Sequence, residues 1–195
     1  MKIVLFDAGI SNVHSISKGL ARADETADIT TDIGRLASAD CLVLPGVGAF
    51  GAAAEALGSV RDKLRTAITG GLPTLGICLG MQLLFSHSAE SPGEGLGVLP
   101  GEVAALSTRR RPHMGWNRVQ PVPGAPTPGL RWAYFAHSYT CVPADPDHIW
   151  TSTTHDGTTF VSAVRSGRIW GAQFHPEKSS REGVDFLRRF LEEAR

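Results

Sequence analysis

Long apolar runs are missing from this sequence. The chain opens on a short apolar stretch, residues 3–6, which ends when Asp7 follows it. A secretory signal peptide and a membrane-spanning helix both need a longer uninterrupted apolar segment. We therefore expect residues 3–6 to form a first strand, and we expect neither a signal peptide nor a membrane span.

Cysteine is also scarce. The three cysteines, Cys41, Cys78 and Cys141, are odd in number and widely spaced, and no C-x-x-C pair occurs. This pattern argues against a disulfide framework and favours a reducing compartment, so we expect a cytoplasmic protein. No group of histidine, cysteine and carboxylate residues has the spacing of zinc ligands, so we predict neither a metal nor a cofactor.

Charge of either sign is not in excess. Nineteen basic and nineteen acidic residues cancel, which excludes the basic surplus typical of nucleic-acid-binding and membrane-surface proteins. The 195 residues suffice for one domain with a substantial core, and no internal repeat or domain boundary is visible. We expect a single domain over residues 1–195.

Strand and helix patterns alternate in the first half of the chain. Continuous apolar runs predict buried strands at residues 3–6, 41–44 and 73–77, with a further strand near 29–31. Helical spacing predicts helices at 13–22, capped by Ser11 or Asn12, and at 51–68, the latter interrupted near Gly58. Such alternation predicts a parallel sheet with flanking helices, whose ligands bind beyond the carboxyl ends of the strands.

Short strands and turns replace this pattern after Gly95. Strands are expected near Val98, Val103 and Val119, and at residues 132–142, 149–154, 160–164 and 168–174. Four prolines within 119–131 predict an exposed loop. Residues 179–182 (SSRE) match a capping box that opens a C-terminal helix with one apolar face. The fold class is therefore α/β, with a mostly parallel central sheet, flanking helices and antiparallel strands in the C-terminal half.

Cys78 lies where a buried strand turns sharply into a helix. Gly76 and Gly80 flank it at the spacing of a G-x-S-x-G nucleophile elbow, with cysteine in place of serine. The glycines allow close backbone approach, and the free N–H groups of the following helix favour a thiolate. The alternative is a small buried apolar side chain, as cysteines often are. The paired glycines favour a nucleophile.

A cysteine nucleophile needs a general base, and that base needs a group to orient it. Among seven histidines, His175 follows a predicted strand and has Pro176 and Glu177 next to it, so that the carboxylate can orient the ring. The other histidines considered have no comparable setting and are expected to be ordinary surface or core residues: His14, His87, His148 and His155.

Backbone N–H groups complete this constellation. The loop 45–48 (PGVG) and the helix N-terminus place the amides of Val47 and Leu79 where an oxyanion hole requires two donors. In isolation the loop glycines fit an ordinary turn equally well. Together the parts predict a thiol-dependent amide hydrolase.

These segments resemble the class I glutamine amidotransferases, through residues 76–82 (GICLGMQ), 45–48 (PGVG) and 174–177 (FHPE). The resemblance spans nearly the whole chain and implies their flavodoxin-like fold. More narrowly, the chain is similar to glutaminase subunits of imidazole glycerol phosphate synthase, an enzyme of histidine biosynthesis. That similarity rests on 44–50 (LPGVGAF), 112–117 (PHMGWN), 134–139 (YFAHSY) and 173–179 (QFHPEKS).

The resemblance implies a role for each site residue. Cys78 would attack the side-chain amide of glutamine, His175 would transfer protons and Glu177 would orient His175, releasing glutamate and ammonia. The implied substrate contacts are Gly48, Gln82, Glu90 and the backbone of Ser138 and Tyr139.

A partner is implied as well. In the family, ammonia passes to a separate (βα)8-barrel cyclase subunit in a heterodimer, which forms imidazole glycerol phosphate and an aminoimidazole carboxamide ribotide. The matching interface positions are Asn12, Trp116, Asn117 and Lys178. For Trp116 and Met114 the alternative is core packing, and for Lys178 a solvated charge.

One segment departs from the family pattern. The usual opening, Asp-Tyr-Gly-x-Gly-Asn, is replaced at residues 7–12 by DAGISN, which alters the implied interface. Two other functions stay open at this point. A glutaminase could serve pyridoxal phosphate or anthranilate synthesis, against which PHMGWN and YFAHSY argue. A non-catalytic protein could share the fold, against which the intact Cys78, His175 and Glu177 argue.

Overall fold

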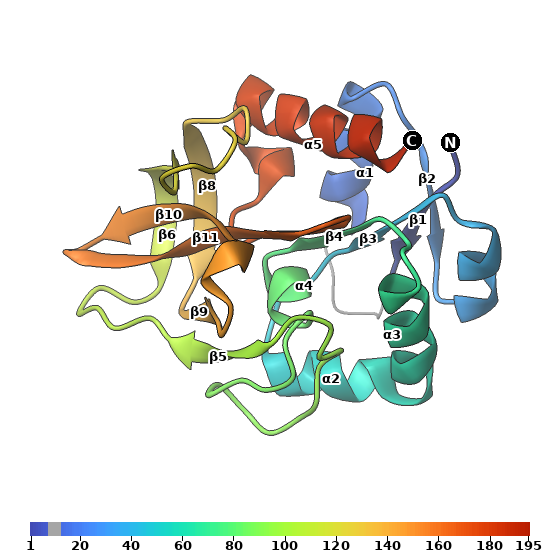
Figure 1. The fold of residues 1–195 in the computed structure, drawn as a ribbon, viewed down its shortest axis with the longest axis horizontal. Helices are drawn as coiled ribbons and strands as arrows, with labels where there is room; N and C mark the ends of the chain where they lie inside the picture. Colours follow the sequence, from blue (N-terminus) through green and yellow to red (C-terminus); the bar gives the residue numbers. More distant parts are fainter. Residues whose placement is uncertain (8–12) are drawn as a thin grey trace.

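The computed structural model describes residues 1–7 and 13–195. The expected Ser11 or Asn12 helix cap, the altered segment at 8–12 and the interface position Asn12 lie outside these residues. An eight-stranded sheet runs through the middle of the molecule in the order β2-β1-β3-β4-β12-β11-β10-β7 (Figure 1). Its first five strands are parallel: β2 (Ala27–Thr30), β1 (Ile3–Phe6), β3 (Cys41–Leu44), β4 (Thr74–Ile77) and β12 (Ile169–Ala172).

Antiparallel strands form the rest of the sheet and two small ribbons. The sheet continues through β11 (Thr158–Ser166), β10 (Ile149–His155) and β7 (Gln120–Pro121). In the ribbons, β5 (Gly101–Ala105) pairs with β9 (Tyr139–Pro143), and β6 (His113–Arg118) pairs with β8 (Trp132–His137). The expected fold class is thus confirmed, including the antiparallel C-terminal half.

Helices cover both faces of the parallel strands. In Figure 1, α1 (Val13–Arg22) and α5 (Ser180–Ala194) lie above the sheet, whereas α2 (Phe50–Leu57), α3 (Arg61–Thr69) and the short α4 (Leu79–Gln82) lie below it. Four 3-10 turns occur in the described chain: η1 (Ile33–Ser38), η2 (Gly58–Val60), η3 (Pro146–His148) and η4 (Pro176–Lys178).

The apolar residues of β1 contribute side chains to both layers of the core. Ile3 and Leu5 belong to the cluster under α1 and α5, and Val4 and Phe6 belong to the cluster over α2 and α3. Successive side chains of a strand point to opposite faces, so a strand covered on both faces must be apolar throughout. This requirement explains why β1 reads as a continuous run.

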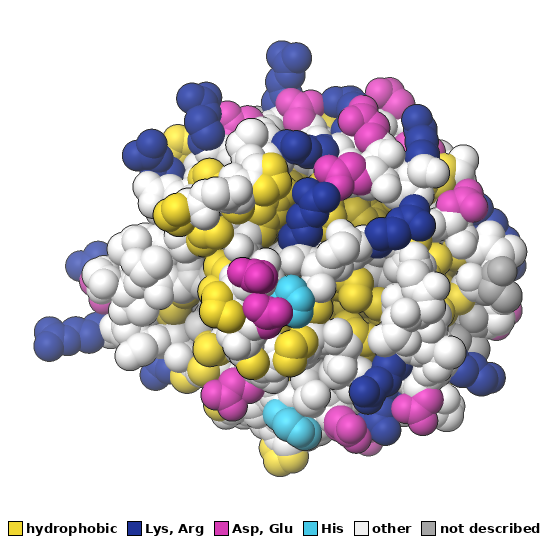
Figure 2. All heavy atoms as spheres, in the orientation of Figure 1, with side chains coloured by type: hydrophobic (Ala, Val, Ile, Leu, Met, Phe, Trp, Pro, Cys, Tyr) yellow, Lys and Arg dark blue, Asp and Glu magenta, His cyan; other side chains and the backbone are white. Residues whose placement is uncertain are grey.

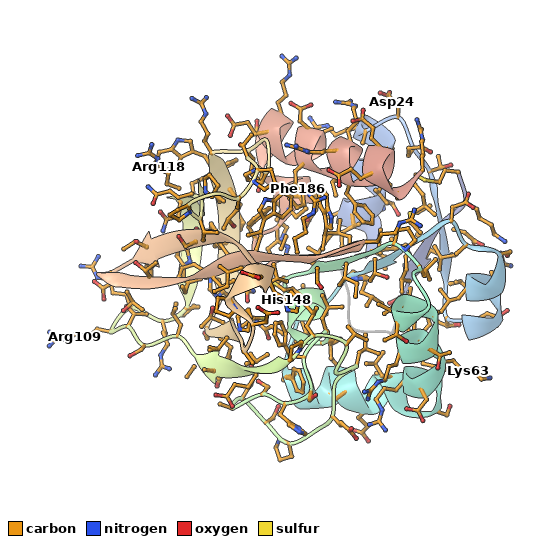
Figure 3. The ribbon with its side chains drawn as sticks, in the orientation of Figure 1. Asp24, Lys63, Arg109, Arg118, His148 and Phe186 are labelled. Atoms are coloured by element: carbon orange, nitrogen blue, oxygen red, sulfur yellow. The ribbon has the colours of Figure 1, made fainter. Side chains whose placement is uncertain are left out.

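Aromatic side chains fill the space beneath α5. The rings of Trp150 and Trp170 lie 4.6 Å apart, and Phe186 of α5, which is labelled in Figure 3, packs against both. Phe174, one residue before His175, packs on Phe186 with a ring distance of 5.3 Å. This cluster anchors the segment that carries His175, because aromatic pairs add directional contacts to apolar burial.

Several expected elements differ from the observed ones. No strand forms around Val98, whose N–H donates to the carbonyl of Leu84. Val119 lies between two strands, because β6 ends at Arg118 and β7 begins at Gln120. The expected strand 132–142 is two strands, β8 and β9, separated at Ser138. Strand β6 was not anticipated. The loop 119–131 is confirmed apart from the two-residue β7, which lies at the edge of the sheet, where proline is tolerated.

The predicted capping box at the start of α5 is wrong, because its two side chains bind other partners. Ser179 does precede the helix, but its hydroxyl donates to the carbonyl of His175 (2.6 Å) and accepts from the N–H of Tyr134 (3.0 Å). Glu182 accepts from the N–H groups of Arg131 (2.7 Å) and Trp132 (3.2 Å). Both side chains thus form hydrogen bonds with other segments of the fold instead of capping the helix. These hydrogen bonds connect β8, η4 and α5.

Acidic and basic side chains are intermixed over the face shown in Figure 2, as the balanced charge leads one to expect. Within the described residues, no helix combines the length and the apolar character needed to cross a membrane.

Candidate active site

The proposed elbow has the backbone of a sharp turn. Cys78 connects β4 to α4 with φ 54° and ψ −110°, a conformation that L residues rarely adopt. A Cβ on Gly80 would lie 1.9 Å from the carbonyl oxygen of Leu44, and one on Gly76 would lie 2.6 Å from the carbonyl oxygen of Gly80. Only glycine permits β3, β4 and α4 to approach this closely, as the sequence predicts.

The thiol of Cys78 is free, and the residue is 7% exposed. The side-chain amide of Gln173 donates to its Sγ atom over 3.6 Å, and the carbonyl of Ala136 lies 3.9 Å away. The two other cysteines are buried, and burial raises the pKa of Cys41 to about 12 and that of Cys141 well above its usual value. Cys78 is therefore the thiol suited to react.

His175 immediately precedes η4, just beyond the end of β12, and its ring is held by Glu177. The Nδ1 atom lies 2.9 Å from Oε1 of Glu177, and the two side chains are 5% and 1% exposed. Because Nδ1 is engaged, Nε2 is the ring nitrogen left for the thiol. Burial acts to lower the pKa of His175, but the hydrogen bonds and charges of Cys78 and Glu177 outweigh it and raise the pKa to about 9.

A cavity of about 380 Å³ lies in front of the thiol. Most of the residues predicted from the sequence line it: Val47, Gly48, Cys78, Leu79, Gln82, Glu90, Ser138, Tyr139, His175 and Lys178. Glu177 is not part of the lining, and it contacts His175 at the Nδ1 edge of the ring. The remaining wall comes from Pro112, Met114, Ala136 and His137. The size suits a ligand as small as an amino acid.

The carboxylate of Glu90 reaches the cavity from a loop. Its Oε2 atom accepts from the N–H of Phe50 (2.7 Å), and the hydroxyl of Ser91 accepts from the N–H of Gly51 (2.8 Å). These two side chains cap the N-terminus of α2, whose own cap residue, Ala49, makes no side-chain bond. Glu90 thus places a negative charge next to Gly48.

Gln82, which also lines the cavity, is buried. Its Nε2 atom donates to Oε1 of Gln173 (3.1 Å) and to the carbonyl of Tyr139 (3.4 Å). The carbonyl of Ser138 accepts from the N–H of Leu106 (2.9 Å). The segment 138–139 therefore joins the cavity wall to the two small ribbons.

The interface positions differ among themselves. Trp116 and Met114 are 52% and 63% exposed, so the core-packing alternative is wrong for both. Lys178 is exposed, with its Nζ atom 5.9 Å from the ring centre of Tyr134. Asn117 instead points inward, where its amide binds His113 and the carbonyl of Thr154. Asn12 lies outside the described residues.

Sequence reasoning missed two buried histidines beside the cavity. His113 and His137 pair across β6 and β8, and their ring nitrogens Nδ1 and Nε2 lie 3.1 Å apart. The signal was the alternation in PHMGWN and YFAHSY, which places both on one face of a ribbon. Of the histidines expected to be ordinary, His148 bonds to Ser166 and His155 to the carbonyl of Arg110. No group of side chains suited to a metal occurs in the described part of the chain.

Known proteins resemble this chain over nearly its whole length. The model of the family "Glutamine amidotransferase class-I" matches residues 4–194. The imidazole glycerol phosphate synthase subunit HisH of Pyrococcus furiosus is 46% identical over 194 residues, 97% of each chain. That of Halobacterium salinarum is 43% identical over 202 residues, covering 97% of this chain and 92% of the relative.

Solved structures show the same fold. A glutamine amidotransferase crystal structure superposes with a TM-score of 0.78 at 18% identity, over 100% of this chain and 99% of the other. A chain of PurLQS from Thermotoga maritima also gives a TM-score of 0.78, at 19% identity, over 98% and 97% of the two chains.

Proposed function

The chain belongs to the class-I glutamine amidotransferases and, within them, to the HisH subunits of imidazole glycerol phosphate synthase; from this we propose how its residues hydrolyse L-glutamine for histidine biosynthesis. The observation that carries the proposal is the buried His175–Glu177 pair, whose imidazole lines the same cavity as Cys78. A nucleophile, a base and an orienting carboxylate are the parts that thiol-dependent acyl transfer requires.

In the first half of the reaction, Sγ of Cys78 attacks the amide carbon of glutamine. The carbonyl oxygen becomes an oxyanion, which the N–H groups of Val47 and Leu79 stabilise. Leu79 begins α4, and the first N–H groups of a helix have no intrahelical acceptor. His175 gives its proton to the amide nitrogen, the C–N bond breaks, and ammonia leaves while a thioester to Cys78 remains.

In the second half, water attacks the thioester carbon. His175 takes a proton from that water, the C–S bond breaks, and glutamate leaves with the thiolate restored. Glu177 holds the imidazole in the tautomer that presents Nε2 to the reacting atoms throughout. No cofactor takes part in this scheme.

Substrate recognition falls to the cavity walls. We propose that the carboxylate of Glu90 binds the α-ammonium group of glutamine next to Gly48, and that Gln82 and the Ser138–Tyr139 backbone hold the opposite side. The Nε2 atom of Gln82 is already engaged, so its Oε1 atom is the one available to a substrate donor.

The Glu90→Gln variant tests this assignment. Glutamine in place of glutamate keeps an oxygen for the N–H of Phe50 and removes the negative charge. The KM for glutamine should rise about tenfold or more with kcat nearly unchanged, since a charge-assisted hydrogen bond contributes roughly 1.5–3 kcal/mol. Steady-state glutaminase kinetics measure it. Glu94→Gln, a neighbouring carboxylate paired with Arg61 on the surface, is the matched control. Equal KM values in the two variants would remove Glu90 from the substrate site.

The partner is proposed to be the (βα)8-barrel cyclase subunit, in a heterodimer. Met114, Trp116 and Trp132, all exposed, lie on the outer face of the β6–β8 ribbon at the side of the cavity that Met114 and Lys178 line. A cyclase docked on this face would receive ammonia as it leaves Cys78. The three free cysteines support a reducing, cytoplasmic location. We treat residues 1–195 as one amidotransferase domain.

A glutaminase assay with and without the cyclase tests the function. We expect weak activity for the isolated chain and at least a tenfold rise with the cyclase and its nucleotide ligand, because a partner can set the Val47 loop for oxyanion binding. Anthranilate and pyridoxal phosphate synthases serve as controls. Stimulation by either of these, and not by the cyclase, would overturn the assignment of the acceptor. An inactive chain under every condition would favour a non-catalytic protein.

A further inference from the structure

His113 and His137 form a buried pair that the catalytic scheme leaves unused. His113 is 2% exposed and His137 is 6% exposed, and His137 also lines the cavity. Two polar rings buried side by side need complete hydrogen bonding, since an unpaired buried polar group is destabilising. The hydrogen-bond partner of each ring nitrogen therefore shows which nitrogen carries the hydrogen.

The direction of each hydrogen bond follows from the carbonyl of Tyr139. That oxygen can only accept, so the Nδ1 atom of His137, 2.8 Å away, must carry the hydrogen. The Nε2 atom of neutral His137 then accepts, and the donor is Nδ1 of His113 at 3.1 Å. The Nε2 atom of His113 must in turn accept a hydrogen bond.

Asn117 supplies that last hydrogen bond. Its Oδ1 atom accepts from the N–H of Arg118 (2.7 Å), which fixes the orientation of the amide. Its Nδ2 group therefore donates, to Nε2 of His113 (3.2 Å) and to the carbonyl of Thr154 (3.0 Å). A single assignment satisfies all these atoms: both rings neutral, both with the hydrogen on Nδ1.

Packing holds the rings in this arrangement. His113 stacks between Phe135, with ring centres 4.7 Å apart, and His155, at 4.1 Å, and His137 packs on Phe160 at 4.9 Å. The titratable groups facing the pair are His155 on β10 and His175 at η4. Burial lowers the pKa of His113 to about 3 and that of His137 to about 4, and these neighbouring histidines act in the same direction.

The series of hydrogen bonds continues from the carbonyl of Tyr139 to the thiol of Cys78. The carbonyl of Tyr139 also accepts from Nε2 of Gln82, which donates to Gln173, whose own amide donates to Sγ of Cys78. The pair thus supports the carbonyl of Tyr139, which also accepts from the amide of Gln82.

We propose that His113 and His137 are positioning residues for glutamine hydrolysis, which hold the carbonyl of Tyr139 and the Gln82 amide in the arrangement that binds glutamine. This inference rests on the proposed glutaminase function. It assigns the pair no contact with the reacting atoms.

Two substitutions of His137 distinguish the loss of its hydrogen bond from the loss of its side-chain volume. Asparagine places its Nδ2 group near the position of Nδ1 and keeps the donor to Tyr139, whereas leucine keeps apolar volume and removes it. His137→Leu should raise the KM for glutamine about tenfold, the effect of a hydrogen bond lost at roughly 1.4 kcal/mol, with kcat changing far less. His137→Asn should recover most of that loss. Steady-state kinetics and melting temperatures are measured together.

Phe160→Leu, which disturbs the same rings without removing a hydrogen bond, is the control and should leave KM unchanged. A His137→Leu variant that folds and keeps its KM, or a His137→Asn variant as impaired as His137→Leu, would overturn the proposal.

Nitrogen-15 spectra of the histidine side chains in the wild-type protein test the pair without any assay. Both rings should be neutral Nδ1–H tautomers from about pH 6 to about pH 8. An Nε2–H tautomer at either ring, or ordinary titration near pH 6.5, would contradict the pair's arrangement even if every variant fails to fold. An inactive wild type with the expected spectra would count against the proposed function and the kinetic part of the proposal, and not against the hydrogen-bond chain.

Discussion

Replacing Cys78 by alanine should reduce glutamate release by at least about 10⁴-fold, to the limit of detection, because the scheme has no other nucleophile. The fold should survive. Alanine retains the Cβ atom at the strained backbone of the elbow, and Sγ makes only weak contacts with Gln173 and Ala136. Glutamate release measured with the cyclase present, alongside circular dichroism and thermal melting, separates loss of chemistry from loss of structure.

Cys41→Ala is the matched control. Cys41 is a buried cysteine at the start of β3, the end of the sheet away from the cavity, and its loss should leave the turnover unchanged. Iodoacetamide labelling near neutral pH adds a direct count of reactive thiols. The wild type and Cys41→Ala should take up one equivalent, and Cys78→Ala none, since burial raises the pKa of both other cysteines.

Residual glutamate release comparable to that of the wild type in Cys78→Ala would remove Cys78 from the catalytic role. Labelling of Cys141 instead of Cys78 would point to the same conclusion by an independent route.

The parts of the molecule that the sequence predicts well are those where local pattern and tertiary environment agree. Strand β1 is apolar because both of its faces are covered, and α1 has the periodicity of a helix with one buried face. At the elbow, Gly76 and Gly80 are required by backbone contacts so close that no other residue fits. Constraints of this kind restrict the residue type at each position, so they can be recognised in the sequence.

The parts that the sequence does not predict depend on distant partners. The pattern SSRE fits a capping box, yet Ser179 binds Tyr134 and the carbonyl of His175, and Glu182 binds the chain at 131–132. Local propensity cannot anticipate that β8 brings competing donors to both side chains. The His113–His137 pair was missed for the same reason, because pairing of β6 with β8 is a long-range event.

The proposed interface shows how exposure decides between alternatives that composition leaves open. Trp116 and Met114 fit a core or a docking surface equally well as residue types, and only the structure places them outside. Asn117 shows the opposite case. The family resemblance implied a place for it at the partner interface, but in the fold the strand alternation turns its amide toward His113.

The Glu177→Gln variant should lower kcat by roughly 10²–10⁴-fold, because a neutral amide neither stabilises the imidazolium of His175 nor fixes its tautomer as a carboxylate does. Glu177 is 1% exposed at its side chain, and the Nδ1–Oε1 distance to His175 is 2.9 Å, so the interaction is screened little by solvent. Glutaminase kinetics over a range of pH, with the cyclase present, measure the effect.

The direction of the pH effect follows from the pKa of His175. Glu177 is one of the groups that raise that pKa from its ordinary value of 6.5 to about 9, against the effect of burial. Without its charge, burial weighs more heavily and the pKa falls. The protonated ring contributes stability that is complete below pH 6.5 and is lost as the pH rises through about 9. The wild type should therefore lose resistance to urea across that window, and Glu177→Gln should lose much less.

Glu192→Gln, on the exposed side of α5, controls for the loss of one carboxylate and should leave both the kinetics and the pH dependence of stability unchanged. The two readouts of Glu177→Gln must move together if one interaction is responsible for both. A large fall in kcat with the wild-type stability profile would mean that Glu177 acts on the substrate and not through His175. A changed profile with full activity would mean that the pair stabilises the fold alone, and the base would then need no orienting carboxylate.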